Sequence, residues 1–303
     1  MTSILAKIAC NALRSVSVIA FVCMGLAGCA SMSEPDGPPR KEFFHAVTQS
    51  NQLIKFNAGQ PQKILERKSI SGLQQGETIL GIDYRVAKGI LYALGDSGRL
   101  YTINTASGAA TQVGKSTFPV KLDGTEFGFD FNPTVDRIRV VSTTGQNLRL
   151  HPDTGGVVDS DDKTAGVQID GTLAFAAGDP NAGKQPRIAA AAYTYNKVNE
   201  KITTNFAIDA ALGLLVTQGT REGATPAVSP NTGQIYTVGS LGTGESARVA
   251  FDIADVTGAG FVALTKAGDN RSRFYLVDLN TGAATFIGTI GGGEAVRGIS
   301  FEP

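Results

Sequence analysis

The chain has 303 residues, of which 42% are hydrophobic and 18% are charged, and its 27 basic side chains balance its 27 acidic ones. This apolar content excludes a disordered chain, and a net charge of zero gives no sign of a nucleic-acid partner. Three cysteines are too few for a disulfide scaffold, and 37 glycines exceed average usage without the three-residue period of collagen.

The first 28 residues have the features of a bacterial lipoprotein signal peptide. Lys7 and Arg14 precede an apolar run over residues 16–27, which is shorter than the roughly 20 residues of a permanent membrane-spanning helix. The run ends in Leu-Ala-Gly-Cys29, a lipobox in which small residues fit the peptidase and the Cys29 thiol takes a diacylglycerol. We expect residues 1–28 to be removed and Cys29 to be lipidated; an ordinary signal peptide with a chance cysteine is the alternative.

This signal predicts a protein held in the bacterial cell envelope by its acyl anchor, with the lipid membrane as its first partner. Ala30 follows Cys29 where an aspartate would favour the inner membrane, so we expect the outer membrane in a Gram-negative organism. Residues 29–42 contain three prolines and almost no large apolar side chain, which predicts a flexible tether. Residues 43–303 are then the folded domain.

A turn pattern recurs along this domain: Asn or Asp, three residues, Gly, five residues, Gly. The copies are Asn104–Gly108–Gly114, Asp209–Gly213–Gly219 and Asp278–Gly282–Gly288. The acceptor side chain begins a turn, and the first glycine supplies the positive φ that the turn needs. Apolar and polar residues alternate on either side, so each copy predicts a β-hairpin.

A second pattern consists of a small residue, an apolar residue, Asp or a small residue, and an aromatic or apolar residue. Its five copies are Gly81–Tyr84, Gly128–Phe131, Ala190–Tyr193, Ala250–Ile253 and Gly298–Phe301. The last residues of successive copies are 47, 62, 60 and 48 positions apart. Further strands fill each interval, which gives about four short strands per unit.

Four-stranded units at this period predict an all-β fold, a β-propeller. The fifth copy ends the chain with no strand after it, whereas the segment 43–70 has three predicted strands with no such copy before them. Joining the two ends completes one blade and pairs an exposed strand edge. We therefore predict five blades closed by N- and C-terminal strands, with six blades or a β-sandwich as alternatives.

Several of these segments resemble a known family. GFDFNPTVDRIRVVSTTGQNLRLHPDTGGVV (128–158), DPNAGKQPRIAAAAYTYN (179–196), LYTINTASGAATQVG (100–114) and FYLVDLNTGAATFIG (274–288) are similar to a bacterial domain of unknown function. Its members are secreted or lipoprotein chains of similar length with propeller-like repeats. The resemblance implies the fold and the export, and it implies no reaction and no catalytic residues.

The sequence offers few residues for catalysis. Lipidation consumes Cys29, no G-x-S-x-G motif is present, and the two histidines, His45 and His151, suit strand packing and a turn. Three aspartates, Asp83, Asp130 and Asp252, occupy the same slot of the second pattern, so the ring should bring them together at one end of the channel. They are candidates for a cation site, with Ca²⁺ as the possible ion; the alternative is that each accepts backbone hydrogen bonds from the adjoining loop.

We therefore expect a non-enzymatic binding or scaffold module, whose partner is an envelope protein or a glycan. Loops at the face of a propeller form a rigid surface suited to binding. A metal-dependent hydrolase or lyase that uses the central channel is the alternative, and a structural envelope component is a third class. The sequence identifies neither a catalytic residue nor a ligand-binding residue.

Overall fold

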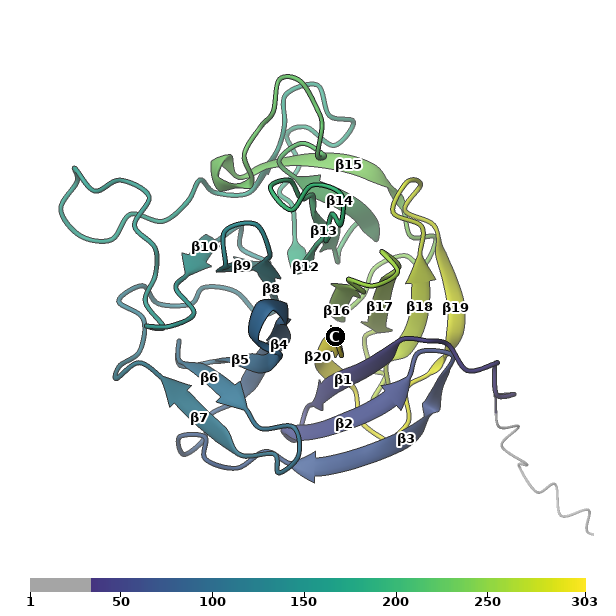
Figure 1. Ribbon diagram of the computed structural model, residues 1–303. Helices are drawn as coiled ribbons and strands as arrows, with labels where there is room; N and C mark the ends of the chain where they lie inside the picture. The colour runs from purple at the N-terminus through teal and green to yellow at the C-terminus, as the bar shows by residue number, and fades with distance from the viewer. Residues whose placement is uncertain (1–33) are drawn as a thin grey trace, which may run out of the picture. The chain divides into compact units, whose positions relative to one another are not determined.

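The computed structural model describes residues 34–303, and these form one compact unit. Its five sheets surround a central channel, so this part of the chain is a five-bladed β-propeller (Figure 1). The predicted signal peptide 1–28 and Cys29 lie outside the described residues. Within residues 34–303, no helix is long and apolar enough to cross a membrane.

Each blade runs outward from an innermost strand beside the channel. From the inside, blade 1 contains β20 (Val296–Phe301), β1 (Phe43–Thr48), β2 (Gln52–Asn57) and β3 (Gln60–Ser69). Blade 2 contains β4 (Ile79–Arg85), β5 (Ile90–Gly95), β6 (Leu100–Ile103) and β7 (Ala110–Val113). Blade 3 contains β8 (Phe127–Asn132), β9 (Arg137–Ser142) and β10 (Asn147–Leu150). Blade 4 contains β12 (Ile188–Tyr193), β13 (Asn205–Asp209), β14 (Leu214–Gln218), β15 (Gln234–Ser240) and β11 (Ala174–Phe175). Blade 5 contains β16 (Arg248–Ile253), β17 (Gly260–Thr265), β18 (Arg273–Val277) and β19 (Ala284–Thr289).

The five copies of the second sequence pattern all lie in the innermost strands, β4, β8, β12, β16 and β20, as predicted. The predicted closure is also confirmed, because β1 pairs antiparallel with β20, with Phe44 opposite Phe301 and Val47 opposite Gly298. Phe44 makes an edge contact with Phe301 and with Phe261 of blade 5, at ring-centroid distances of 6.1 and 5.1 Å. The two chain ends thus build one blade and its apolar contact with the next.

The core is divided among the junctions between blades. Five clusters of buried apolar side chains each combine residues of two neighbouring blades. The junction of blades 1 and 2, for example, packs Val47 and Leu53 against Ile79, Ile82 and Leu91. Because each blade buries its faces against its neighbours, closing the ring completes the core.

Two blades depart from the predicted four strands. In blade 3 the fourth strand is reduced to an isolated bridge between Leu150 and Val157, and the chain then runs as a loop. It re-enters regular structure at β11, which pairs parallel with β15 and adds a fifth strand to blade 4. This addition covers an edge that would otherwise be free, which limits edge-to-edge association.

The predicted hairpin turns are present, but they do not occupy one common place. Asn104 Oδ1 accepts hydrogen bonds from the backbone amides of Ala106 and Ser107, and Gly108 has φ = 79°. That copy joins the third and fourth strands of its blade, whereas the copy at Asp209 joins the second and third. The shared spacing therefore reflects the chemistry of the turn rather than a fixed position in the repeat.

The predicted tether is ordered over its described part. Residues 34–42 contain no strand, yet they lie against the body of the propeller. The Arg40 amide donates to Asn57 Oδ1 at 2.9 Å, and the Thr289 amide donates to Glu34 Oε2 at 2.7 Å. Residues 34–42 therefore pack against the propeller, which begins its first strand at Phe43.

Candidate functional site

The five inner strands end at one mouth of the central channel, where residues from all five line a cavity of about 240 Å³. We call this cavity the cup. Its carboxylates are Asp83, Asp130, Asp136, Asp252, Asp255 and Glu200, and its aromatic walls include Phe131, Tyr193, Tyr195 and Phe301. It lies at the opposite end of the inner strands from their small residues.

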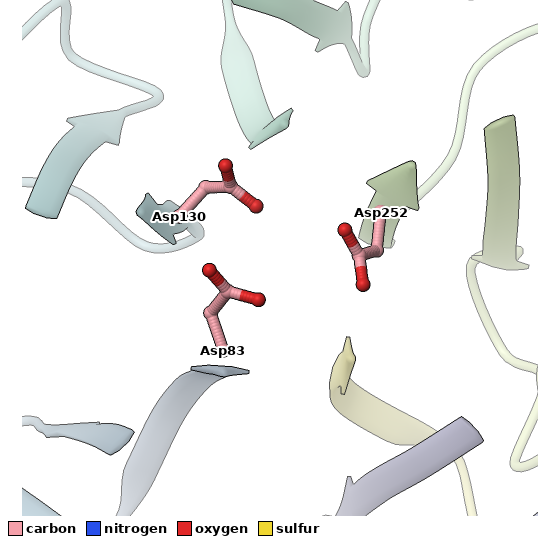
Figure 2. Close-up of side chains that lie close together, drawn as sticks. All are labelled: Asp83, Asp130 and Asp252. Carbon is pink, nitrogen blue, oxygen red and sulfur yellow. The ribbon is translucent and has the colours of Figure 1, made fainter. Parts of the chain in front are cut away.

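Asp83, Asp130 and Asp252 converge at the base of the cup, as the sequence predicts. Their side chains point toward one another from β4, β8 and β16 (Figure 2). All three residues are buried, and each offers an oxygen that lies within 4.8 Å of the others. The common slot in the repeat therefore corresponds to a common place in space.

Each of these aspartates also links its own inner strand to another inner strand of the ring. Asp83 accepts from the Phe131 amide at 2.7 Å, and Asp130 accepts from the Tyr193 amide at 2.8 Å. Asp252 accepts from the Phe301 amide at 2.6 Å. The predicted backbone acceptor role is therefore present, but the donor belongs to the neighbouring inner strand and not to an adjoining loop.

The remaining two junctions use other groups, because Ser300 and Ala192 occupy the slot there. Ser300 Oγ accepts from the Tyr84 amide at 3.1 Å and donates to Asp83 Oδ1 at 2.9 Å. Ala192 has no acceptor, and the amide of Ile253 instead donates to Asp252 Oδ1 at 2.6 Å. Four of the five junctions between inner strands therefore carry a side-chain link.

Burial and mutual repulsion make these carboxyl groups hard to ionise. Burial raises the pKa of Asp83 to about 7, against the opposing effect of its hydrogen bonds from Phe131 and Ser300. Burial, followed by the charges of neighbouring aspartates, holds the pKa of Asp130 and that of Asp252 well above the ordinary value. At neutral pH the cup therefore retains protons on carboxyl groups that would be ionised in water.

Asp130 and Asp255 each carry an oxygen with no hydrogen-bond donor among residues 34–303. Asp130 accepts its one hydrogen bond at Oδ2, which leaves Oδ1 without a partner. Asp255 Oδ2 is buried and has no partner, and burial raises the pKa of this side chain to about 6. Because Asp255 Oδ2 is removed from water without a donor, it carries a desolvation cost that a ligand can offset.

The one basic side chain that lines the cup is already engaged. Arg85 Nε donates to Asp136 Oδ1 at 2.8 Å, and Arg85 Nη1 donates to Asp153 Oδ1 at 2.5 Å. The guanidinium is thereby neutralised by two carboxylates outside the base of the cup. The converging aspartates have no cation of their own among the residues that line this cavity.

The far end of the channel is closed by backbone contacts. A Cβ on Gly128 would lie 2.6 Å from the backbone nitrogen of Ala191, and one on Gly298 would lie 2.8 Å from that of Ile82. The void left there is about 10 Å³, too small for more than one water. The cup is therefore open at one face and closed beneath its aspartates.

The ionisable groups that line the cup are carboxylates, tyrosine hydroxyls and the Arg85 guanidinium. Its lining residues include no histidine, cysteine, serine or lysine. Burial lowers the pKa of His45 to about 4, and its Nδ1 lies 3.1 Å from the hydroxyl of Tyr84. His151 accepts the Asp153 amide in a turn. Both histidines thus have packing and turn roles.

Sequence reasoning missed Asp255, Glu200 and Tyr195, which belong to the connections that follow β16 and β12. These connections differ in length, so the three residues share no slot in the repeat. A usable signal was present for Asp255, which stands three residues after Asp252 at the end of the same inner strand.

Comparison with solved structures finds matches of low sequence identity. A nidogen/laminin complex matches with 12% identity and a TM-score of 0.45, over 86% of this chain and 98% of that one. A structural genomics protein of unknown function from Bacteroides thetaiotaomicron matches with 15% identity and a TM-score of 0.42, over 84% and 60% of the two chains. The structure titled YCF48 bound to D1 peptide matches with 11% identity and a TM-score of 0.35, over 81% and 63%. These similarities carry no information about function.

The curated proteins contain no match to this chain. A family model does match it, that of the domain of unknown function DUF4394, over residues 52–300. The match includes the inner strands β4, β8, β12 and β16, and it ends inside β20. Because it spans most of the chain, this protein belongs to the DUF4394 family.

Proposed function

We propose that this protein is a binding module that takes a cationic group into the cup. The observation that carries the proposal is the convergence of Asp83, Asp130 and Asp252 in a cavity whose one basic residue, Arg85, is already paired. A cation placed among the three carboxylates would replace the protons they retain. It would also supply partners for Asp130 Oδ1 and Asp255 Oδ2.

The links between blades and the binding of a cation do not compete. Each aspartate uses one oxygen for the amide of the neighbouring strand, and the second oxygen of Asp130 remains for a ligand. Burial is the main cause of the raised pKa values, and a ligand that neutralises the cluster would remove the repulsion that adds to it. Binding should therefore strengthen as pH rises, because ionised carboxylates are the binding form.

The test measures the melting temperature of the full chain with n-butylammonium chloride, against sodium chloride of equal ionic strength. We expect n-butylammonium to raise the melting temperature at pH 8, to raise it less at pH 5.5, and to have no effect on Asp130→Asn. The asparagine keeps an acceptor for the Tyr193 amide and removes only the charge. Asp162→Asn, in an exposed turn, is the matched control. An equal shift of the melting temperature in wild type and in Asp130→Asn would exclude the cup as the site where n-butylammonium binds.

A second candidate function is a metal site at the same aspartates. Oxygens bound to one Ca²⁺ at roughly 2.3–2.6 Å can lie up to about 5 Å apart, and the oxygens of Asp83, Asp130 and Asp252 lie within 4.8 Å of one another. A metal here would be the basis of the alternative activity, a hydrolase or lyase that uses the channel. Elemental analysis with no stoichiometric metal, together with a melting temperature insensitive to chelator, would exclude this candidate.

We further propose that Cys29 anchors the protein in the bacterial envelope, at the outer membrane if the organism is Gram-negative. The support is the charged start, the short apolar run and the lipobox of residues 1–29, with Ala30 after the cysteine. Cys29→Ser should move the protein from the membrane fraction to the soluble fraction and abolish labelling with radioactive palmitate. A variant that stays membrane-bound would contradict the acyl anchor.

A further inference from the structure

Exposed apolar side chains surround the mouth of the cup. Val86, Val135, Val198 and Val256 are all exposed, and Val198 is 97% exposed. Each valine lies in the connection that follows the inner strand of its blade: β4, β8, β12 or β16. Four blades therefore present one exposed valine each at the face where the cup opens.

Blade 1 differs, because its inner strand β20 pairs with β1, which comes from the other end of the domain, so no connection joins these two strands. Phe43 takes that place, since it begins β1 beside the end of β20, and the Glu302 amide donates to its carbonyl at 2.9 Å. Its side chain is exposed as well. We call Val86, Val135, Val198, Val256 and Phe43 the rim.

The rim loops are braced against one another. Arg85 pairs with Asp136 across blades 2 and 3. Lys197 Nζ donates to the carbonyl of Val256 at 2.6 Å, and Thr257 Oγ1 donates to Glu42 Oε1 at 2.9 Å. Loops held in this way lose little conformational entropy when a partner docks, so the surface is preorganised for binding.

We propose that the rim and the cup together form the docking surface for a polypeptide that inserts one lysine or arginine side chain into the cup. This inference rests on the proposed function, because it names the bearer of the cationic group. A desolvated central pocket surrounded by apolar contacts that exclude water is the arrangement of an interaction hot spot. Aromatic walls such as Tyr193, Tyr195 and Phe301 suit the methylene stem and the charge of a basic side chain.

Size and charge favour this occupant over others. A cavity of about 240 Å³ lies below the roughly 300–1,000 Å³ of typical small-molecule pockets, and its floor is closed. One side chain fits it better than a whole organic ligand. Clustered carboxylates repel nucleic acids and anionic lipid surfaces, whereas a metal ion or a small amine would leave the five exposed apolar side chains without contacts.

The experiment selects ligands for the full-length protein from a displayed library of random dodecapeptides. The best peptide is then compared with a copy in which each basic residue is replaced by norleucine. We expect enriched peptides to share a lysine or arginine beside apolar residues, and we expect norleucine to weaken binding at least tenfold. Asp130→Asn should weaken the binding of the selected peptide to a similar extent.

The rim is tested with the triple variant Val135→Ser, Val198→Ser and Val256→Ser. We expect this variant to bind the selected peptide three- to tenfold more weakly and to keep the response to n-butylammonium. Leu65→Ser, an exposed apolar residue on β3, is the matched control and should leave both unchanged. All these side chains are exposed, so the fold should tolerate the changes.

The two proposals fail in different ways. The docking inference is overturned if peptide affinity is unchanged by the rim variant and by norleucine in place of the basic residue. If n-butylammonium still raises the melting temperature of wild type and not that of Asp130→Asn, the proposed cation site is nevertheless retained. If neither the effect of n-butylammonium nor the binding of the peptide depends on Asp130, the proposed function and the docking inference are both overturned. The docking inference is also overturned if Ca²⁺ binds tightly and blocks every selected peptide, while the rim variant has no effect on peptide binding.

Discussion

The two ends of the central channel are built by the same five strands in opposite ways. At the closed end, glycine and alanine let the backbones of neighbouring blades meet, as Gly128 does against Ala191. At the open end, side chains of Asp83, Asp130, Asp252 and Ser300 join the blades through hydrogen bonds. The closed end also carries charged side chains, because Arg297 lines its void and Arg248 Nη1 pairs with Glu126 Oε1 at 3.1 Å. The open end differs in that three buried carboxylates converge there. The proposed cation site is placed at the open end because the carboxylates converge there on a cavity of about 240 Å³.

Filling the closed end should give the largest effect. Gly128→Val places side-chain atoms where a Cβ already lies 2.6 Å from the Ala191 backbone nitrogen. We expect a loss of about 3 kcal/mol or more in the free energy of unfolding, measured with urea. Gly156→Ala, whose Cβ would meet nothing closer than the Thr154 hydroxyl at 3.3 Å, is the control. A variant as stable as wild type would show that the closed end is loosely packed.

The pH dependence of stability should reveal the buried charge of the open end. Burial raises the pKa of Asp83 from 3.8 to about 7, so the folded state keeps a proton that the unfolded chain releases. The contribution of this proton to the free energy of unfolding is complete at pH values below the pKa of Asp83 in the unfolded chain. It is lost as the pH rises through the pKa of Asp83 in the folded state. The asparagine of the Asp83→Asn variant does not ionise, so this site causes no loss of stability in the variant as the pH rises.

Between pH 5 and pH 8 this loss covers about two pKa units, each worth about 1.4 kcal/mol, so the free energy of unfolding of Asp83→Asn should fall by about 2–3 kcal/mol less than that of wild type. Urea denaturation at both pH values measures the two falls. Parallel pH profiles for wild type and variant would mean that Asp83 ionises normally.

Removing one link at the open end should cost less. Asp130→Ala leaves the buried Tyr193 amide without its acceptor, whereas Asp130→Asn keeps one. We expect the alanine variant to be less stable than the asparagine variant by at least about 1 kcal/mol at pH 8, again by urea denaturation. Equal stability of the two variants would argue against a structural role for the hydrogen bond.

The smallest effect should come from the junction that has no link. Ala192→Ser imitates Ser300, but the Ile253 amide is already satisfied by Asp252 at 2.6 Å. We therefore expect the free energy of unfolding to change by less than about 0.5 kcal/mol. A clear gain in stability would mean that the hydrogen bond from the Ile253 amide to Asp252 stabilises the fold less than a hydrogen bond between two blades would.

Much of the ring could be predicted because its signals are local and repeated. A small residue, an apolar residue and an acceptor recur in the inner strands, which located the five strands and the convergence of Asp83, Asp130 and Asp252. The missing strand of blade 3 and the addition of β11 to blade 4 were not predicted, since a two-residue parallel pairing leaves no periodic trace. The order of residues 34–42 likewise depends on contacts such as Arg40 with Asn57.

The sequence by itself favoured five blades over six blades or a β-sandwich, and it predicted the closure of the ring and the meeting of three carboxylates, because a repeated slot becomes a repeated position once the ring closes. Only the tertiary structure decided which amides those carboxylates bind, that Arg85 is paired elsewhere, and that Phe43 completes the rim. These features join residues from different blades, and their distances depend on how the blades pack around the channel.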